Sequence, residues 1–365
     1  MTSIDHLVEE AVSLHDRALA ARQEGDLDQA ATLGREALHL FEKADGPDHP
    51  DVANVLLHLG GVSEDRAAYA EAEACYRRAV DIVDIYEAGD ADLDHLRLQT
   101  WGDLAGVRRA LGAYEEAEAL YKRALDFAAA TFGPEAQEIA ALLNGLGVVY
   151  KFAGRFAEAE SLYRRALAIL ECNLGPDHLE VAAIYHNLGG LEHARGHPAR
   201  GEPYARRSVE ILEQALGPEH PKVAADWVAL AALLDELGRD DEAEKLYLEA
   251  LAVFERTLGS EHYEVGATCN NLGALYQDRG QYDEAEAQHH RALAIQEEVL
   301  GSGHPEVGLT LHNLAVLHHA QELDEPADEY YRQALDIFQQ TLAAEHPHAV
   351  ACREDWGRLR ERMQK

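Results

Sequence analysis

The sequence is poor in basic side chains. Only 32 Lys and Arg stand against 67 Asp and Glu among 365 residues, which gives a net charge of −35. Proteins that bind nucleic acids or anionic membranes present basic surfaces to phosphate groups. The composition therefore predicts that neither nucleic acid nor a membrane is the main partner. With 47% hydrophobic residues, the chain still has the apolar content of a folded protein.

Cysteines are scarce and long apolar runs are absent. The four cysteines, Cys75, Cys172, Cys269 and Cys352, lie far apart and form no C-x-x-C pair. This spacing predicts isolated, reduced thiols rather than a disulfide framework or a zinc site. No stretch approaches the roughly 20 apolar residues that span a bilayer. The first residues, MTSIDHLVEE, carry acids where a signal peptide has bases, so we expect a cytoplasmic protein.

The usual catalytic signatures are missing as well. The sequence contains no G-x-x-x-x-G-K-[ST], H-E-x-x-H, G-x-S-x-G or G-x-G-x-x-G motif. Acidic pairs such as Glu158 and Glu160 recur in register, as is typical of solvated helix starts, where negative charge is favourable. Acid–base catalysis instead needs a unique constellation of residues in a pocket. We expect no enzymatic activity and no cofactor.

What the sequence does contain is an internal repeat. LGPDHLEVAAIYHNLGGL begins at Leu174, and related segments begin at Leu216, Leu258 and Leu300, each 42 residues after the last. A second string, which reads DEAEKLYLEAL at Asp241, recurs with the same step. We count eight repeats over residues 7–345, with three extra residues in the polar stretch 88–94, and a closing helix over residues 346–365.

Each repeat is predicted to be an antiparallel pair of helices. Apolar residues recur at three- and four-residue steps, as at Val181, Ile184 and Leu188, which is helical periodicity. Glycines stand where a helix end and turn belong, and G-P-x-H-P segments punctuate the joins between repeats. Tyrosines recur at one position of the second helix and are expected to fill the seams between pairs. They are Tyr121, Tyr163 and Tyr247. A single pair cannot bury its apolar face, so the pairs must stack.

The pattern L-G-x-x-Y…G-x-Y-x-E-A-E-x-x-Y-x-R-A-L resembles the tetratricopeptide repeat. The 42-residue period, with L-G-P-x-H-P-x-V-A between units, is similar to the longer repeat of kinesin light chains and their bacterial relatives. The resemblance covers nearly the whole chain. It implies an all-α fold, a right-handed superhelical solenoid of antiparallel helix pairs that forms a single domain over residues 1–365. It also implies a concave groove, lined by the first helix of each pair, that binds peptides or proteins.

Two repeats depart from the pattern. The fifth reads GHPARGEPYARRSV, and its Pro198 and Pro203 predict that the second helix starts late or bends. In the eighth, Glu322 replaces the turn glycine and Pro326 stands at the helix start. These departures fit either tolerated drift in the first turn or a soft point in the superhelix.

Histidine is abundant, with 20 residues. Six belong to the recurring loop and are interpreted as hydrogen-bonding at helix entries: His49, His178, His220, His262, His304 and His346. The pairs His186/His193 and His312/His319 each share one helical face by their i, i+7 spacing. Metal sites need three or four converging ligands, so we expect these pairs to line the groove and to bind no metal.

The first helices supply the candidate groove residues. Arg109, Lys151 and His193 occupy one position in three consecutive repeats and predict a short basic ladder. A second line is rich in asparagine amides, which both donate to and accept from a peptide backbone. Its members are Asn144, His186, Asn187, Asn270, Asn271, His312 and Asn313. Small side chains lie between the two lines and leave room for a partner, among them Gly106, Val148, Gly190, Ala232 and Ala274.

These features predict a non-enzymatic adaptor that binds a peptide segment of a partner protein. The ladder favours an acidic segment, while the acidic convex face offers a surface to a basic partner. Three alternatives stay open. The chain could be a regulator whose superhelix changes pitch when a small peptide or metabolite binds, or an enzyme or metal protein that uses the histidines. The groove could also be a solvated surface with no dedicated ligand. The sequence leaves the oligomeric state undetermined.

Overall fold

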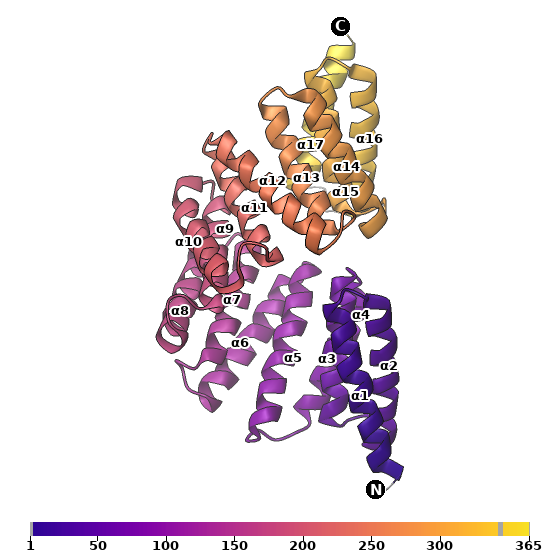
Figure 1. The fold of residues 1–365 in the computed structure, drawn as a ribbon, viewed down its shortest axis with the longest axis vertical. Coiled ribbons are helices and arrows are strands. Elements are labelled where there is room, and N and C mark those ends of the chain that lie inside the picture. The colour runs from indigo at the N-terminus through magenta and orange to yellow at the C-terminus, as the bar shows by residue number, and fades with distance from the viewer. Residues whose placement is uncertain (1–2, 342–345, 365) are drawn as a thin grey trace. The chain divides into compact units, whose positions relative to one another are not determined.

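The structure is a computed structural model. It describes residues 3–341 and 346–364, which form seventeen α-helices (Figure 1). The chain divides into two compact units, unit 1 over residues 1–176 and unit 2 over residues 177–365. The last residues of the predicted eighth repeat, 342–345, and residue 365 of the predicted closing helix lie outside the described residues. None of the helices described is long and apolar enough to cross a membrane.

Unit 1 consists of four helix pairs joined by short turns. In chain order they are α1 (Ser3–Gln23) with α2 (Leu27–Ala44), α3 (Pro50–Asp65) with α4 (Tyr69–Asp84), α5 (Ala91–Ala110) with α6 (Tyr114–Thr131), and α7 (Gln137–Phe152) with α8 (Phe156–Leu174).

Unit 2 consists of four further pairs and a closing helix. They are α9 (Leu179–Ala194) with α10 (Pro198–Leu216), α11 (Pro221–Glu236) with α12 (Asp240–Thr257), α13 (Tyr263–Asp278) with α14 (Tyr282–Leu300), α15 (Pro305–Ala320) with α16 (Asp324–Thr341), and finally α17 (Pro347–Met363). The predicted all-α fold of helix pairs is confirmed.

The recurring loop histidines begin the first helices. Each is the N-cap residue of its helix, and its Nδ1 accepts a hydrogen bond from the backbone N–H two residues later, at 3.1–3.3 Å. This contact satisfies one of the backbone donors that a helix start leaves unpaired. The six histidines are those at 49, 178, 220, 262, 304 and 346. The interpretation of these residues as helix-entry contacts is confirmed.

The recurring tyrosines fill the core within the stacks. Tyr163 is fully buried, and a Cβ added at Gly147 would lie 2.5 Å from its ring. The same relation holds in the second repeat, where a Cβ added at Gly60 would lie 2.2 Å from Tyr76. Glycine in the first helix therefore makes room for the aromatic ring of the second, because an added methyl group would overlap it.

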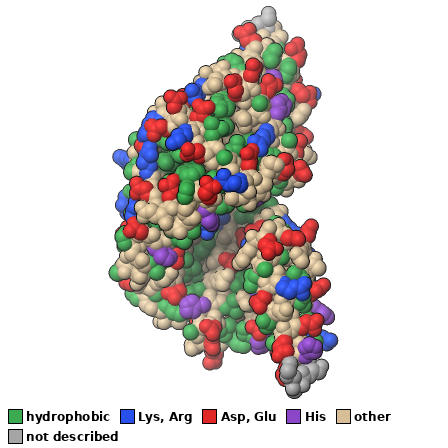
Figure 2. All heavy atoms as spheres, viewed as in Figure 1, with side chains coloured by type: hydrophobic (Ala, Val, Ile, Leu, Met, Phe, Trp, Pro, Cys, Tyr) green, Lys and Arg blue, Asp and Glu red, His purple; other side chains and the backbone are tan. Residues whose placement is uncertain are grey.

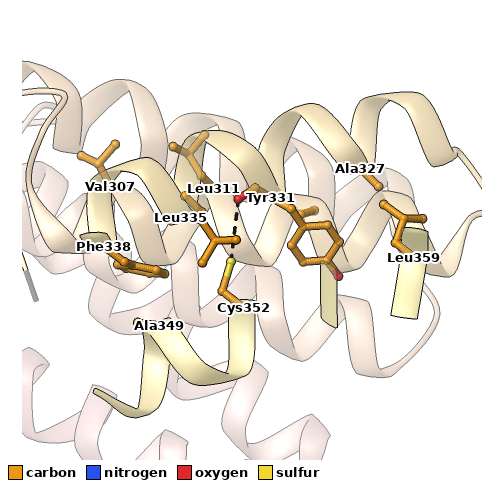
Figure 3. Close-up of a cluster of buried hydrophobic side chains, with 11 residues drawn as sticks. Val307, Leu311, Ala327, Tyr331, Leu335, Phe338, Ala349, Cys352 and Leu359 are labelled. Atoms are coloured by element: carbon orange, nitrogen blue, oxygen red, sulfur yellow. Dashed lines mark hydrogen bonds between the residues drawn. The ribbon is translucent and has the colours of Figure 1, made fainter. Parts of the chain in front are cut away.

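The end of unit 2 is closed by α17. Cys352 and Leu359 of this helix are fully buried against Tyr331 and Phe338 of α16 (Figure 3). The Cys352 Sγ lies 3.9 Å from the Tyr331 carbonyl oxygen, and burial raises the pKa of this thiol to about 12. The thiol therefore stays protonated and packs as a small apolar group.

The three-residue insertion lies at the join between α4 and α5. Here α5 is 20 residues long, whereas α3 and α7 have 16. Its first turns hold a buried ion pair between Arg97 and Asp94, and the Arg97 guanidinium donates to the carbonyls of Val83 and Tyr86 at 3.1 and 2.9 Å. Arg97, which follows the insertion, is thus a buried cation that satisfies two carbonyls at and just after the end of α4.

The expected late start of the second helix in the fifth repeat is wrong. Helix α10 begins at Pro198, and α8 of the preceding repeat begins at Phe156, which is 42 residues earlier. Proline is accepted at this position because the first N–H groups of a helix have no intrahelical acceptor. Pro203 lies inside the same helix.

Candidate peptide-binding groove

Side chains on the first helices meet across successive repeats. The recurring contact joins residues 43 positions apart: Arg22 donates to Asp65, and His95 contacts Glu138 in unit 1. In unit 2 the Tyr263 hydroxyl donates to Glu306 at 2.8 Å. The spacing is one residue longer than the 42-residue period because each side chain contacts the residue that follows its equivalent in the next repeat. Polar side chains therefore link α1 with α3 and α5 with α7 in unit 1, and α13 with α15 in unit 2.

Arg109 and Lys151 both lie close to one exposed aromatic ring in unit 1. The Arg109 Cζ is 5.4 Å and the Lys151 Nζ is 5.1 Å from the ring centroid of Phe152, which is 54% exposed. Burial lowers the pKa of Lys151, and the neighbouring charge of Arg109 lowers it further. Two like charges held together in this way favour an anion between them.

The third member of the predicted ladder, His193, lies in unit 2 and has an acidic partner. Its Nε2 is 2.9 Å from Glu236 Oε1. Two helical turns earlier on the same face, His186 Nδ1 is 2.8 Å from Asp226 Oδ1. Both histidines of this i, i+7 pair therefore link α9 to a carboxylate of α11, and the surroundings of His193 are acidic rather than basic.

A pocket of about 270 Å³ lies in unit 2 among α9, α10, α11 and α13. It brings together three predicted groove residues, His186, His193 and Asn271, with the small positions Gly190 and Ala232. The rest of its lining is Asp226 and a set of apolar side chains: Ala205, Ala225, Val228, Ala229 and Leu233.

The pocket exists where the repeat pattern fails. Five repeats carry a buried tyrosine at one position of the second helix: Tyr76, Tyr121, Tyr163, Tyr247 and Tyr331. In the fifth repeat this position is Ala205, which lines the pocket. Replacing a phenol ring by a methyl group removes the atoms that fill the seam elsewhere, so the space stays open.

Asp226 places a carboxylate at a position that is apolar or hydroxylic in the neighbouring repeats. The matching residues are Leu142, Ile184, Thr268 and Thr310. Asp226 is only 7% exposed, and among the described residues no group donates to its Oδ2. A buried carboxylate oxygen without a donor costs free energy, and a ligand that donates a hydrogen bond to it would offset this cost.

Asn270 and His312 do not line an open surface, so their assignment to the groove is corrected. Asn270 is 8% exposed, and its Oδ1 accepts hydrogen bonds from Thr310 and Asn313 and contacts His289 Nδ1. His289 stands at the tyrosine position of the seventh repeat, where its ring lies against Gly273 and its Nδ1 adds a polar contact to Asn270.

His312 is covered by the closing helix. It is 8% exposed, and its Nε2 lies 2.9 Å from Asp355 Oδ2 of α17. Asn313 is half-buried, and its amide donates to Asn270 at 3.1 Å. Asn144 on α7 and Asn187 on α9 are also half-buried.

The histidine pairs do not converge into a metal site among the described residues. Three potential ligand atoms come together there at Asp45, His49 and Asp51 alone. The His49 Nδ1 accepts the backbone N–H of Asp51 as part of the helix cap, so this nitrogen is already used. His186, His193 and His312 contact carboxylates on neighbouring helices instead.

Sequence reasoning missed the two residues that make the pocket distinctive, Ala205 and Asp226. Both could have been found by reading the repeats column by column. Ala205 is a loss of volume at an aromatic position, and Asp226 is a charge at a core position. Each departure is meaningful because the other repeats show what the fold requires at that place.

The comparisons with known families agree with this geometry. The sequence profile of the tetratricopeptide repeat family matches residues 9–84, 96–171, 180–256 and 264–340, which is most of the chain. No curated protein sequence matches the chain.

The chain is similar to several solved structures of repeat proteins. RapI in its apo form is 15% identical with a TM-score of 0.58, over 80% of this chain and 98% of that one. A Rap protein complexed with Competence and Sporulation Factor is 16% identical with a TM-score of 0.50, over 98% and 99%. A Podosopora anserina protein described as a kinesin light chain with nearly identical TPR-like repeats is 29% identical with a TM-score of 0.47, over 55% and 94%.

Proposed function

We propose a function that starts from the family of the chain. The chain belongs to the tetratricopeptide repeat family, and its 42-residue repeat is of the kinesin-light-chain-like type. Such a chain is a scaffold for protein interaction. The finer proposal is that it is a non-enzymatic adaptor that holds a peptide segment of a partner protein against its first helices. As a single solenoid of eight repeats with a closing helix, it would offer this face along its length.

The observation that carries the proposal is the pocket in unit 2. It combines an apolar floor with the polar edges of His186, His193 and Asn271, which suits a side chain of a bound peptide and the backbone beside it. In unit 1, Arg109 and Lys151 beside Phe152 offer a second contact, for an acidic side chain. A Rap protein of this fold is complexed with Competence and Sporulation Factor, which supports the choice of a ligand held by the repeats.

Selection from a displayed library of random peptides tests the proposal. A selected peptide is then titrated against the protein and against Ala205→Tyr, which returns the tyrosine of the other repeats and fills the pocket. The matched control is Ala252→Tyr, which adds the same ring at an exposed position of α12. We expect Ala205→Tyr to weaken binding about tenfold or more and the control to leave it unchanged. Failure to select any peptide contradicts the adaptor proposal.

A further inference from the structure

We propose that the pocket in unit 2 is a receptor for a cationic side chain, the guanidinium of an arginine or the ammonium of a lysine on a partner polypeptide. The inference rests on the proposed function and names the chemistry that one part of the groove recognises. It comes from the Asp226 carboxylate, from the shape of the pocket around it, and from the charges on α11.

The first step is the carboxylate. Asp226 lines the pocket and is 7% exposed, and its Oδ1 contacts His186 Nδ1 at 2.8 Å. Its Oδ2 is buried with no donor among the described residues. An ionised carboxylate has room for about four hydrogen bonds, so one histidine contact leaves most of this capacity unused. A bound N–H donor with a positive charge would compensate both the charge and the missing hydrogen bonds.

The second step is access. The His186 side chain is 44% exposed and forms the outer edge of the pocket beside Asp226. For an incoming group to reach the carboxylate, this exposed ring has to rotate away from Asp226. The apolar floor formed by Val228, Ala229 and Leu233 suits the methylene stem of an arginine or lysine, which buries its carbons along apolar surface while its charged end reaches a polar group.

The third step is the electrostatic field. Near the end of α11, burial together with the charges of Asp278, Asp240 and Glu236 raises the pKa of Asp235 to about 6. Carboxylates raise one another's pKa where negative charges gather, and a cation is attracted to such a region. Asp and Glu side chains are also spread over the visible face of unit 2 (Figure 2).

The test uses four pools of nonapeptides that are random except for the central residue, which is arginine, lysine, citrulline or glutamate. Citrulline matches arginine in shape and carries no charge. Each pool is titrated by isothermal calorimetry against the full chain. We expect the arginine and lysine pools to bind about tenfold or more tightly than the citrulline pool, as a hydrogen-bonded charge pair predicts. The glutamate pool can also bind Arg109 and Lys151 of unit 1, so it serves as a control whose binding should not weaken in Asp226→Asn.

Asp226→Asn keeps the shape of the side chain and removes its charge, so it should abolish the preference for arginine over citrulline. Asp336→Asn removes the same charge from an exposed position of α16 and should change nothing. Ala205→Tyr fills the pocket and leaves every charge in place. If circular dichroism shows that Asp226→Asn does not fold, Ala205→Tyr takes its place as the variant in which the preference for arginine over citrulline is measured.

The outcomes separate the two proposals. If the citrulline pool binds as tightly as the arginine pool, the cationic pocket is wrong and peptide binding by the repeats stands. The same conclusion follows if the arginine preference survives both Asp226→Asn and Ala205→Tyr, because the cation then binds elsewhere. If no pool binds, both the cationic pocket and the peptide-binding function are wrong.

Discussion

His193 Nε2 lies 2.9 Å from Glu236 Oε1, and this contact joins the first helices of two successive repeats. The partner changes what His193 offers to a ligand. A protonated His193 is compensated by Glu236 and adds little attraction for an acidic peptide. Of the predicted basic ladder, Arg109 and Lys151 near Phe152 in unit 1 are therefore the members left to attract an acidic peptide.

The first prediction concerns this pair. Changing Arg109 and Lys151 together to Glu should weaken the binding of an acidic peptide severalfold or more, because two attractive charges become repulsive. The effect should be smaller at high salt, since these side chains are partly exposed. Titration of a labelled acidic peptide at two salt concentrations measures it. Arg35→Glu with Lys43→Glu makes the same charge change at exposed positions of α2 and should have little effect. Binding of basic peptides alone, unchanged in the double variant, would contradict the ladder.

A second prediction concerns acid sensitivity in unit 1. The rings of His15 and His58 are 5.4 Å apart and buried, and neither nitrogen of His58 has a hydrogen-bond partner among the described residues. Burial, and then the charges of His15 and Arg22, lower the pKa of His58 to about 4. Desolvation also lowers the pKa of His15. The folded state therefore holds these histidines neutral.

The sign of the effect follows from linkage. The unfolded chain takes up the protons near pH 6.5, whereas the folded chain takes up that of His58 near pH 4. Stability is complete above pH 6.5 and is lost as the pH falls toward 4, by an amount on the order of 2–3 kcal/mol for His58. Urea unfolding at several pH values measures this loss. His58→Leu should flatten the profile over this range, and His6→Leu, at an exposed position of α1, should leave it unchanged. A profile equally steep in both variants would contradict the assignment.

A third prediction concerns the turn between α15 and α16. Glu322 has a positive φ of 61°, in the place where all preceding repeats but the second have glycine, for example Gly280 with φ 73°. This backbone conformation costs a residue with a Cβ about 1–2 kcal/mol, which exceeds the entropic cost of glycine. Glu322→Gly should raise the free energy of unfolding by about 0.5–1 kcal/mol. The reverse change, Gly280→Glu, should lower it by about 1 kcal/mol. Thermal unfolding followed by circular dichroism compares the two, and a destabilised Glu322→Gly would show that the turn is not strained.

A fourth prediction concerns metals. We expect purified, tag-free protein to hold no stoichiometric zinc, iron or nickel, because His186 and His312 contact carboxylates of neighbouring helices rather than converging with other ligands. Elemental analysis by plasma mass spectrometry measures the content. One metal ion per chain that disappears in His186→Ala or His312→Ala would show that these residues do form a site.

The sequence by itself determined the helices and the way they pair. The 42-residue period, the histidines before each first helix and the glycines after it act locally, through caps, turns and 3.6-residue periodicity. The tyrosines at the repeated position likewise indicated where the seams are filled. These features are readable because each depends on residues close to one another in the chain.

Only the tertiary structure decided which polar side chains remain available to a ligand. Asn270 and His312 occupy the same lines in the sequence as Asn271 and His186, yet the first two are buried and the other two line the pocket. The difference arises from neighbours far away in the chain: Asn270 meets Thr310, and His312 meets Asp355. Exposure is a property of the packed helices, because whether a side chain is covered depends on which residue the adjacent repeat or closing helix places above it.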